Sequence, residues 1–207
     1  LRIWSDVFGN SIFALRGFSA FFGILAVPAT YYLVKQIFKS QRATIVAAVL
    51  VAISPFQLLY VSEARMYTMG AFFAITSALF LAKALEGQKL WAERQKDNIP
   101  NLLEDKKLKR QFLLYFLLFA VSTIIIIYTH YYLLFTAAAI CFYGLMFHWR
   151  AHKSKITRYG WLLLSYLVIA LSFLPWLKIF LFQFQQVGGS YWIPAMLAEE
   201  LPENDCP

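Results

Sequence analysis

The sequence has 207 residues, of which 60% are hydrophobic and 14% are charged, and its formal net charge is +8. Soluble domains usually carry about a quarter charged residues, so this composition excludes an ordinary soluble domain and is typical of a membrane protein. At roughly 20 residues for each membrane span, the chain has room for about six spans and for no separate soluble domain.

Apolar runs recur along most of the chain, separated by short polar connections. A segment inside lipid must satisfy all of its backbone N–H and C=O groups internally, and a helix does so. We therefore predict an all-α polytopic membrane protein, a single transmembrane domain with about six transmembrane helices. The predicted spans, in chain order, lie near 11–34, 43–61, 66–82, 111–128, 131–149 and 161–184.

The positive charge is concentrated in alternate connections between these runs. Fifteen of the 19 Lys and Arg residues lie in or beside the segments 35–42, 83–110 and 150–158. Connections rich in Lys and Arg face the cytoplasm, so we predict a cytoplasmic loop at 83–110 and an extracytoplasmic tail at 185–207. The charge thus indicates the orientation of the chain in the membrane rather than a nucleic-acid partner.

With this orientation, aromatic and ionisable residues gather on the extracytoplasmic side. The turn at 62–65, the "YTHYY" turn at 128–132, the "GGSYWIPAM" segment at 188–196 and the N-terminal "RIWSD" all lie there. The cytoplasmic side has no comparable cluster of Tyr, His, Trp and Glu. We therefore expect any substrate site at the extracytoplasmic face.

Three residues of the first turn are candidates for binding a substrate. If the third span begins near Glu63, then Glu63 and Tyr67 lie four residues apart and share one helix face. Arg65 offers a planar guanidinium that can pair with a phosphate or a carboxylate. In the second turn, His130 is a residue of the type that can accept or donate a proton, and Tyr131 can donate a hydrogen bond to a sugar hydroxyl.

All of these residues have an alternative interpretation as membrane-surface anchors, because Tyr and Arg are common at the ends of membrane helices. Arg16 is equally open, since its side chain either extends to the surface or meets an anion within the bundle. The chain has no Gly-rich phosphate loop, no metal-ligand spacing and no nucleophile elbow. We predict no metal site and no certain cofactor, and the need for a divalent metal stays open.

Four stretches together resemble a known family. They are "IWSDVFGNSIFALRGFSAFFGILAVPATYYLVKQIF", "ISPFQLLYVSEARMYTMGAF", "YTHYYLLF" and "SYWIP". The chain resembles the dolichyl-phosphate-mannose protein mannosyltransferase-like family, bacterial glycosyltransferases of the C-type membrane fold. The resemblance runs over nearly the whole chain, and "SPFQLLYVSEARMY" is its most specific part.

The resemblance implies a multi-pass enzyme of the bacterial inner (plasma) membrane. Such an enzyme moves one sugar from a polyprenyl-phosphate-linked donor to a lipid, protein or glycan acceptor at the extracytoplasmic face. The acidic residue that such enzymes use as a base is expected upstream of Leu1, in a longer polypeptide, so no residue here receives a catalytic role. The substrate-binding candidates are Arg16, Glu63, Arg65, Tyr67, His130, Tyr131 and Trp192.

Two other classes of protein stay open from the sequence. A multi-spanning transporter or lipid flippase would carry its polar residues near the bilayer midplane, often in paired halves. Here the polar residues gather at one face and no second half mirrors the first, which favours the enzyme. A structural subunit of a membrane complex is the third interpretation.

Overall fold

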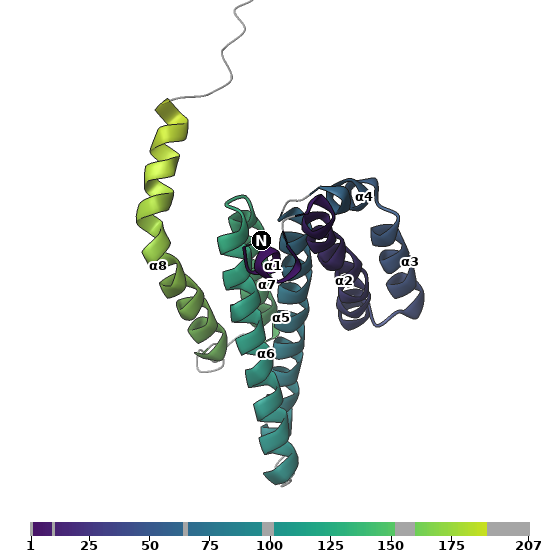
Figure 1. Cartoon of the computed structure of the whole chain (residues 1–207). Helices are drawn as coiled ribbons and strands as arrows, with labels where there is room; N and C mark the ends of the chain where they lie inside the picture. The colour runs from purple at the N-terminus through teal and green to yellow at the C-terminus, as the bar shows by residue number, and fades with distance from the viewer. Residues whose placement is uncertain (1, 10, 64–65, 97–101, 152–159, 190–207) are drawn as a thin grey trace, which may run out of the picture. The chain divides into compact units, whose positions relative to one another are not determined.

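The computed structural model describes residues 2–9, 11–63, 66–96, 102–151 and 160–189 (Figure 1). Every regular element among these residues is an α-helix, so the predicted all-α class is confirmed for the described part of the chain. The helices are α1 (Arg2–Phe8), α2 (Ile12–Phe38), α3 (Gln41–Ala52), α4 (Pro55–Ser62), α5 (Tyr67–Lys96), α6 (Leu102–Thr129), α7 (Leu133–Ala151) and α8 (Gly160–Gly189).

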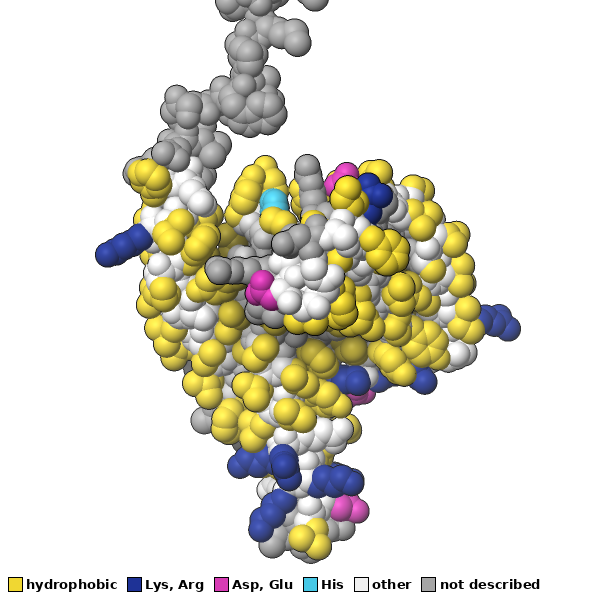
Figure 2. All heavy atoms as spheres, in the orientation of Figure 1, with side chains coloured by type: hydrophobic (Ala, Val, Ile, Leu, Met, Phe, Trp, Pro, Cys, Tyr) yellow, Lys and Arg dark blue, Asp and Glu magenta, His cyan; other side chains and the backbone are white. Residues whose placement is uncertain are grey.

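Five of these helices, α2, α5, α6, α7 and α8, are long and apolar enough to cross a membrane. Exposed Leu, Ile, Val and Phe side chains cover much of their outer surface (Figure 2), as lipid-facing helices require. The prediction of a polytopic membrane protein is therefore confirmed. The number of crossings and the side on which each connection lies stay predictions.

The predicted span at 43–61 contains two helices, α3 and α4, with a break between them. Pro55 is the first residue of α4, and a proline at this position begins a helix readily because its missing N–H is not needed there. The 12 residues of α3 extend for about 18 Å, which is less than the hydrocarbon thickness of about 30 Å. The Gln57 side-chain amide donates to the Gly23 carbonyl at 3.0 Å and holds α4 against α2.

The range 83–110, predicted as a loop, is largely helical. α5 continues to Lys96 and α6 already begins at Leu102, with Glu104 and Asp105 in its first turn, where acidic residues favour a helix. The Arg94 guanidinium meets the Glu104 carboxylate at 2.7 Å across the pair. At 30 and 28 residues, the two helices extend for about 45 and 42 Å, longer than the apolar thickness of a bilayer.

α5 and α6 run antiparallel and form the best-packed pair of helices in the structure (Figure 1). Leu81 and Leu85 of α5 and Phe112 and Phe119 of α6 are almost completely buried. The Ser77 hydroxyl of α5 and the Thr123 hydroxyl of α6 lie 2.8 Å apart in the interface of these two helices. Because lipid gives no hydrophobic drive between helices, such close packing and shared hydrogen bonds hold them together.

The chain divides into two units, residues 1–172 and residues 173–207. In the first unit, the Tyr166 hydroxyl donates to the Cys141 carbonyl and the Tyr128 hydroxyl to the Ser172 carbonyl, each at 2.5 Å. These bonds connect the first half of α8 to α7 and α6. The described part of the second unit is the rest of α8, in which the rings of Phe173 and Phe180 lie 5.8 Å apart.

Candidate functional site

The structure places five of the seven predicted binding residues. Tyr67 is the first residue of α5, Glu63 ends α4, and Arg16 is an exposed residue of α2. His130 and Tyr131 form the turn between α6 and α7. The other two, Arg65 and Trp192, lie outside the described residues.

Tyr67 and His130 come together although 63 positions separate them in the sequence. Their rings lie 5.7 Å apart, centroid to centroid. The His130 ring also stacks on the rings of Tyr131 and Tyr132, at 4.8 and 5.4 Å. The backbone N–H of Tyr132 donates to His130 Nδ1 at 3.3 Å. An accepting Nδ1 leaves the proton of the neutral ring on Nε2, which is then a donor for a ligand.

Two further aromatic residues extend this arrangement along α4. The Tyr60 ring lies 4.7 Å from the Tyr67 ring, and the Phe56 ring lies 4.3 Å from the Tyr60 ring. Neither residue was among the predicted binding residues, although residues four apart on a helix share one face and both stand in the most specific stretch of the resemblance. We define the aromatic cluster as Tyr60, Tyr67, His130, Tyr131 and Tyr132.

Gly70 allows the elements of the aromatic cluster to approach. A Cβ at this position in α5 would lie 2.6 Å from Cδ1 of Leu133, the first residue of α7. With only hydrogen at Gly70, Leu133 packs directly onto α5. The Leu133 N–H donates to the His130 carbonyl at 2.9 Å, so the same contact sets the turn beside Tyr67.

Glu63 does not lie on α5 as the sequence suggested, and Arg16, for which the sequence left two settings open, is exposed on α2. The backbone of Glu63 is extended, with φ −90° and ψ 137°, and α5 begins four residues later. Glu63 and Tyr67 therefore do not share a helix face, because Glu63 ends the preceding helix. Arg16 has no ring contact or ion pair with the aromatic cluster within the described part of the chain.

A groove adjoins the aromatic cluster where α2, α5 and α6 meet. It has a volume of about 340 Å³ and is lined by Phe18, Met66, Met69, Ile125, Tyr128 and Thr129. Met66 and Thr129 immediately precede Tyr67 and His130, so groove and cluster are neighbours. The Thr129 hydroxyl donates to its own helix, at the Ile125 carbonyl, which leaves the groove mainly apolar.

The Tyr131 phenol of the turn holds its proton more tightly than a free tyrosine does. The side-chain hydrogen bond to Tyr132 raises the pKa of the Tyr131 phenol, and partial desolvation raises it further. Among the described residues, no three His, Cys, Asp or Glu side chains gather as metal ligands would. The chemistry of this end of the molecule is that of aromatic stacking and neutral hydrogen-bond donors.

Residues 1–93 match the family model described as dolichyl-phosphate-mannose-protein mannosyltransferase. The matched part contains α1 to α4 and most of α5, including Tyr60 and Tyr67. No curated protein and no solved structure matches the chain. The resemblance expected from the sequence is thus confirmed for residues 1–93, and with the five apolar helices it indicates a membrane glycosyltransferase of the mannosyltransferase type.

Proposed function

We propose that this chain is part of a membrane enzyme of that family, which moves one sugar from a polyprenyl-phosphate donor to an acceptor at the extracytoplasmic face. The observation that carries the proposal is the convergence of Tyr60, Tyr67 and His130 from three separate segments of the chain. The aromatic cluster is proposed as the sugar-binding surface.

Aromatic rings suit a sugar for two physical reasons. The flat face of a ring packs against the C–H face of a pyranose, while phenol O–H and imidazole N–H groups donate to its hydroxyls. The exposed Tyr131 and Tyr132 and the half-buried Tyr67 and His130 offer both kinds of contact within one group of side chains. Simple membrane-surface anchors do not need to converge in this way.

The apolar groove beside the aromatic cluster suits the isoprenoid chain of the donor. Its Met and Phe side chains are flexible or flat apolar surfaces that adapt to a branched hydrocarbon. A donor lying along this groove would bring its sugar to the cluster. Arg16 is proposed to meet the phosphate, and Glu63 to contact the acceptor.

The proposed reaction is a direct displacement at the anomeric carbon. The acceptor oxygen forms a bond to that carbon as the bond to the lipid phosphate oxygen breaks, and the acceptor proton passes to a base. The leaving phosphate gains negative charge, which a neighbouring guanidinium stabilises. The residues assigned here bind and orient substrate, and none of them is proposed as the base.

The test uses the complete protein and a polyprenyl-phosphate-linked sugar as donor. We expect Tyr67→Phe and His130→Ala each to lower kcat/KM about tenfold or more, the effect of losing one hydrogen bond to a bound substrate. The matched control is Tyr32→Phe, since Tyr32 is an exposed tyrosine of α2 that lies outside the aromatic cluster and packs its ring against that of Tyr31. Wild-type transfer by both cluster variants would leave these residues as surface anchors and refute the proposal.

A further inference from the structure

A second pocket lies far along α5 and α6 from the aromatic cluster. It has a volume of about 260 Å³, and its walls come from α2, α5 and α6. Lys83 in its wall follows Tyr67 by 16 residues along α5, which corresponds to about 24 Å. The pocket is therefore a separate site, and no step of the proposed sugar transfer uses it.

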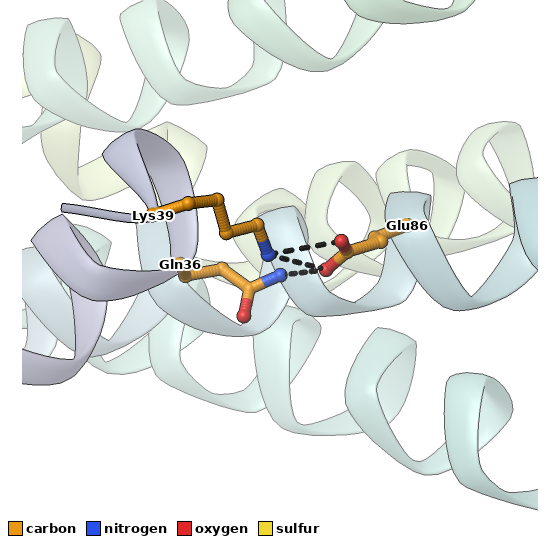
Figure 3. Close-up of polar contacts among 3 residues, drawn as sticks. All are labelled: Gln36, Lys39 and Glu86. Atoms are coloured by element: carbon orange, nitrogen blue, oxygen red, sulfur yellow. Dashed lines mark hydrogen bonds and ion pairs between the residues drawn. The ribbon is translucent and has the colours of Figure 1, made fainter.

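The wall of the pocket includes an acidic residue, Glu86 of α5, whose charge is already compensated. The Glu86 carboxylate accepts a hydrogen bond from the Gln36 amide and meets the Lys39 ammonium at 2.9 Å (Figure 3). Lys39 follows the end of α2, so this contact also holds α2 against α5. Glu86 and Lys39 together contribute no net charge to the pocket.

The wall also includes a cation, Lys83, one turn before Glu86 on α5, and Glu86 forms its ion pair with Lys39 instead. Lys83 places its ammonium 5.3 Å from the centroid of the Tyr115 ring. Within the part of the chain that the structure describes, Lys83 has no carboxylate partner, whereas Lys39, Lys89 and Arg94 each have one. The Gln111 amide, also in the wall, donates to the Tyr115 hydroxyl at 3.5 Å. The pocket thus presents one net positive charge among neutral hydrogen-bonding groups.

The pocket lies where the apolar surface of the helices ends. Lys83 is the first charged residue after the apolar run at 66–82, and Leu90, Leu108 and Phe112 complete the wall. Beyond the pocket, the exposed side chains of Leu114, Leu117 and Val121 follow one another along the apolar part of α6. A polar recess next to a lipid-facing surface suits a molecule with a charged head and apolar chains.

We propose that this pocket binds the phosphate group of a membrane lipid, with the Lys83 ammonium as its ionic partner. Lysine binds phosphate as a point charge, and the Tyr115 ring holds the ammonium in place by a cation–π contact. The acyl chains extend along the exposed apolar side chains of α6. Such a lipid would fill the recess between α2 and the α5–α6 pair.

The proposal is tested with the complete protein in detergent, by native mass spectrometry of bound lipid. The probes are phosphatidylglycerol, diacylglycerol without a phosphate, and glycerophosphate without chains. We expect tight binding of phosphatidylglycerol only. Lys83→Gln should weaken it about tenfold, as the loss of a charge-assisted hydrogen bond does, whereas Lys83→Arg should retain it.

Two further variants distinguish the pocket from general surface charge. Lys89→Gln is the matched control, because Lys89 lies on the same helix, pairs with Glu93 and does not line the pocket. It should bind phosphatidylglycerol as the wild type does. Glu86→Gln removes the negative charge from the wall and should tighten binding. Thermal unfolding of each variant confirms that it is folded before binding is compared.

Three results would overturn the proposal. Equal loss of binding in Lys83→Gln and Lys89→Gln would assign the effect to general surface charge. Diacylglycerol binding as tightly as phosphatidylglycerol would show that the site recognises only chains. Glycerophosphate binding as tightly as the lipid would assign the pocket to a soluble phosphate compound instead.

Discussion

Gly70 of α5 faces Leu133 of α7 so closely that a Cβ on Gly70 would lie 2.6 Å from the Leu133 Cδ1 atom. This contact sets the 128–132 turn beside the start of α5, where Tyr67 meets His130. We predict that Gly70→Val lowers the free energy of unfolding by about 1 to 3 kcal/mol, the usual cost of overpacking. Thermal unfolding in detergent measures it.

The control for this prediction is Gly160→Val, because a Cβ at Gly160 meets no atom of the described residues within 4 Å. Shortening Leu133 in the double variant Gly70→Val, Leu133→Ala should restore part of the lost stability. If Gly70→Val unfolds at the same temperature as Gly160→Val, the Leu133 side chain moves aside at no cost and the predicted overpacking is refuted.

The hydroxyls of Ser77 and Thr123 couple α5 to α6. Thr123 donates to the Phe119 carbonyl, so Ser77 donates to Thr123 in the buried pair. A double-mutant cycle with Ser77→Ala and Thr123→Val should give a coupling energy of about 0.6 kcal/mol, and at most about 1.7 kcal/mol, as found between membrane helices. Unfolding titrations in denaturing detergent measure it.

Thr76 provides the control for this cycle. Among the described residues, its hydroxyl donates to carbonyls of its own helix, those of Phe72 and Phe73. Thr76→Val should therefore show no coupling to Thr123→Val. An equal coupling in the two cycles would contradict the assignment of the interhelical bond.

Buried side chains and exposed ion pairs at the far end of the α5–α6 pair should differ in their contributions to stability. Phe112 is 1% exposed, and Phe112→Ala should cost about 3 to 5 kcal/mol. Arg94 and Glu104 are both exposed, so Arg94→Ala should cost far less stability than Phe112→Ala. The same unfolding measurement compares them, and similar costs would show that this end is not packed as described.

The Tyr131 phenol of the aromatic cluster should lose its proton at a higher pH than a free tyrosine does. The pKa of Tyr131 is raised by its hydrogen bond to Tyr132, so the folded protein holds this proton more tightly than the unfolded chain. Its contribution to stability is complete below the unfolded pKa of about 10 and is lost as the pH rises through the higher folded value. No change is expected near pH 7.

Difference absorbance spectra between the wild type and Tyr131→Phe isolate this phenol during an alkaline titration. The midpoint should lie above that of a free tyrosine, and Tyr132→Phe should move it down. A midpoint at the ordinary value in the wild type would show that the two phenols do not share a hydrogen bond.

The all-α class of the fold could be predicted from the sequence, but the full length of its helices could not. Runs such as 161–184 are apolar throughout, and only a helix satisfies their backbone in lipid, which makes the all-α class predictable. The continuation of α5 to Lys96 was missed because hydropathy records the end of the apolar run and not the end of the helix. The break before Pro55 was visible as a proline, but prolines also occur inside unbroken helices, as Pro28 does in α2.

The candidate site was predictable as a list of residues but not as an arrangement. The distribution of positive charge and the family resemblance indicated Tyr67 and His130 as individual residues, without indicating that their rings lie together. Their contact depends on the packing of α5 against α7, for which the only local signal was a glycine at position 70. Tyr60 was missed because one tyrosine near a helix end is also typical of a membrane-surface anchor.

The central claim is that the aromatic cluster faces the extracytoplasmic side, and cysteine labelling in intact cells tests it most directly. Cys141 and Cys206 are first replaced by Ser, and single cysteines are placed at Tyr131 and at Lys107 of α6. We predict that a membrane-impermeant maleimide labels position 131 in intact cells and position 107 only after permeabilisation. Labelling of position 107 in intact cells, with position 131 protected until permeabilisation, would contradict the account.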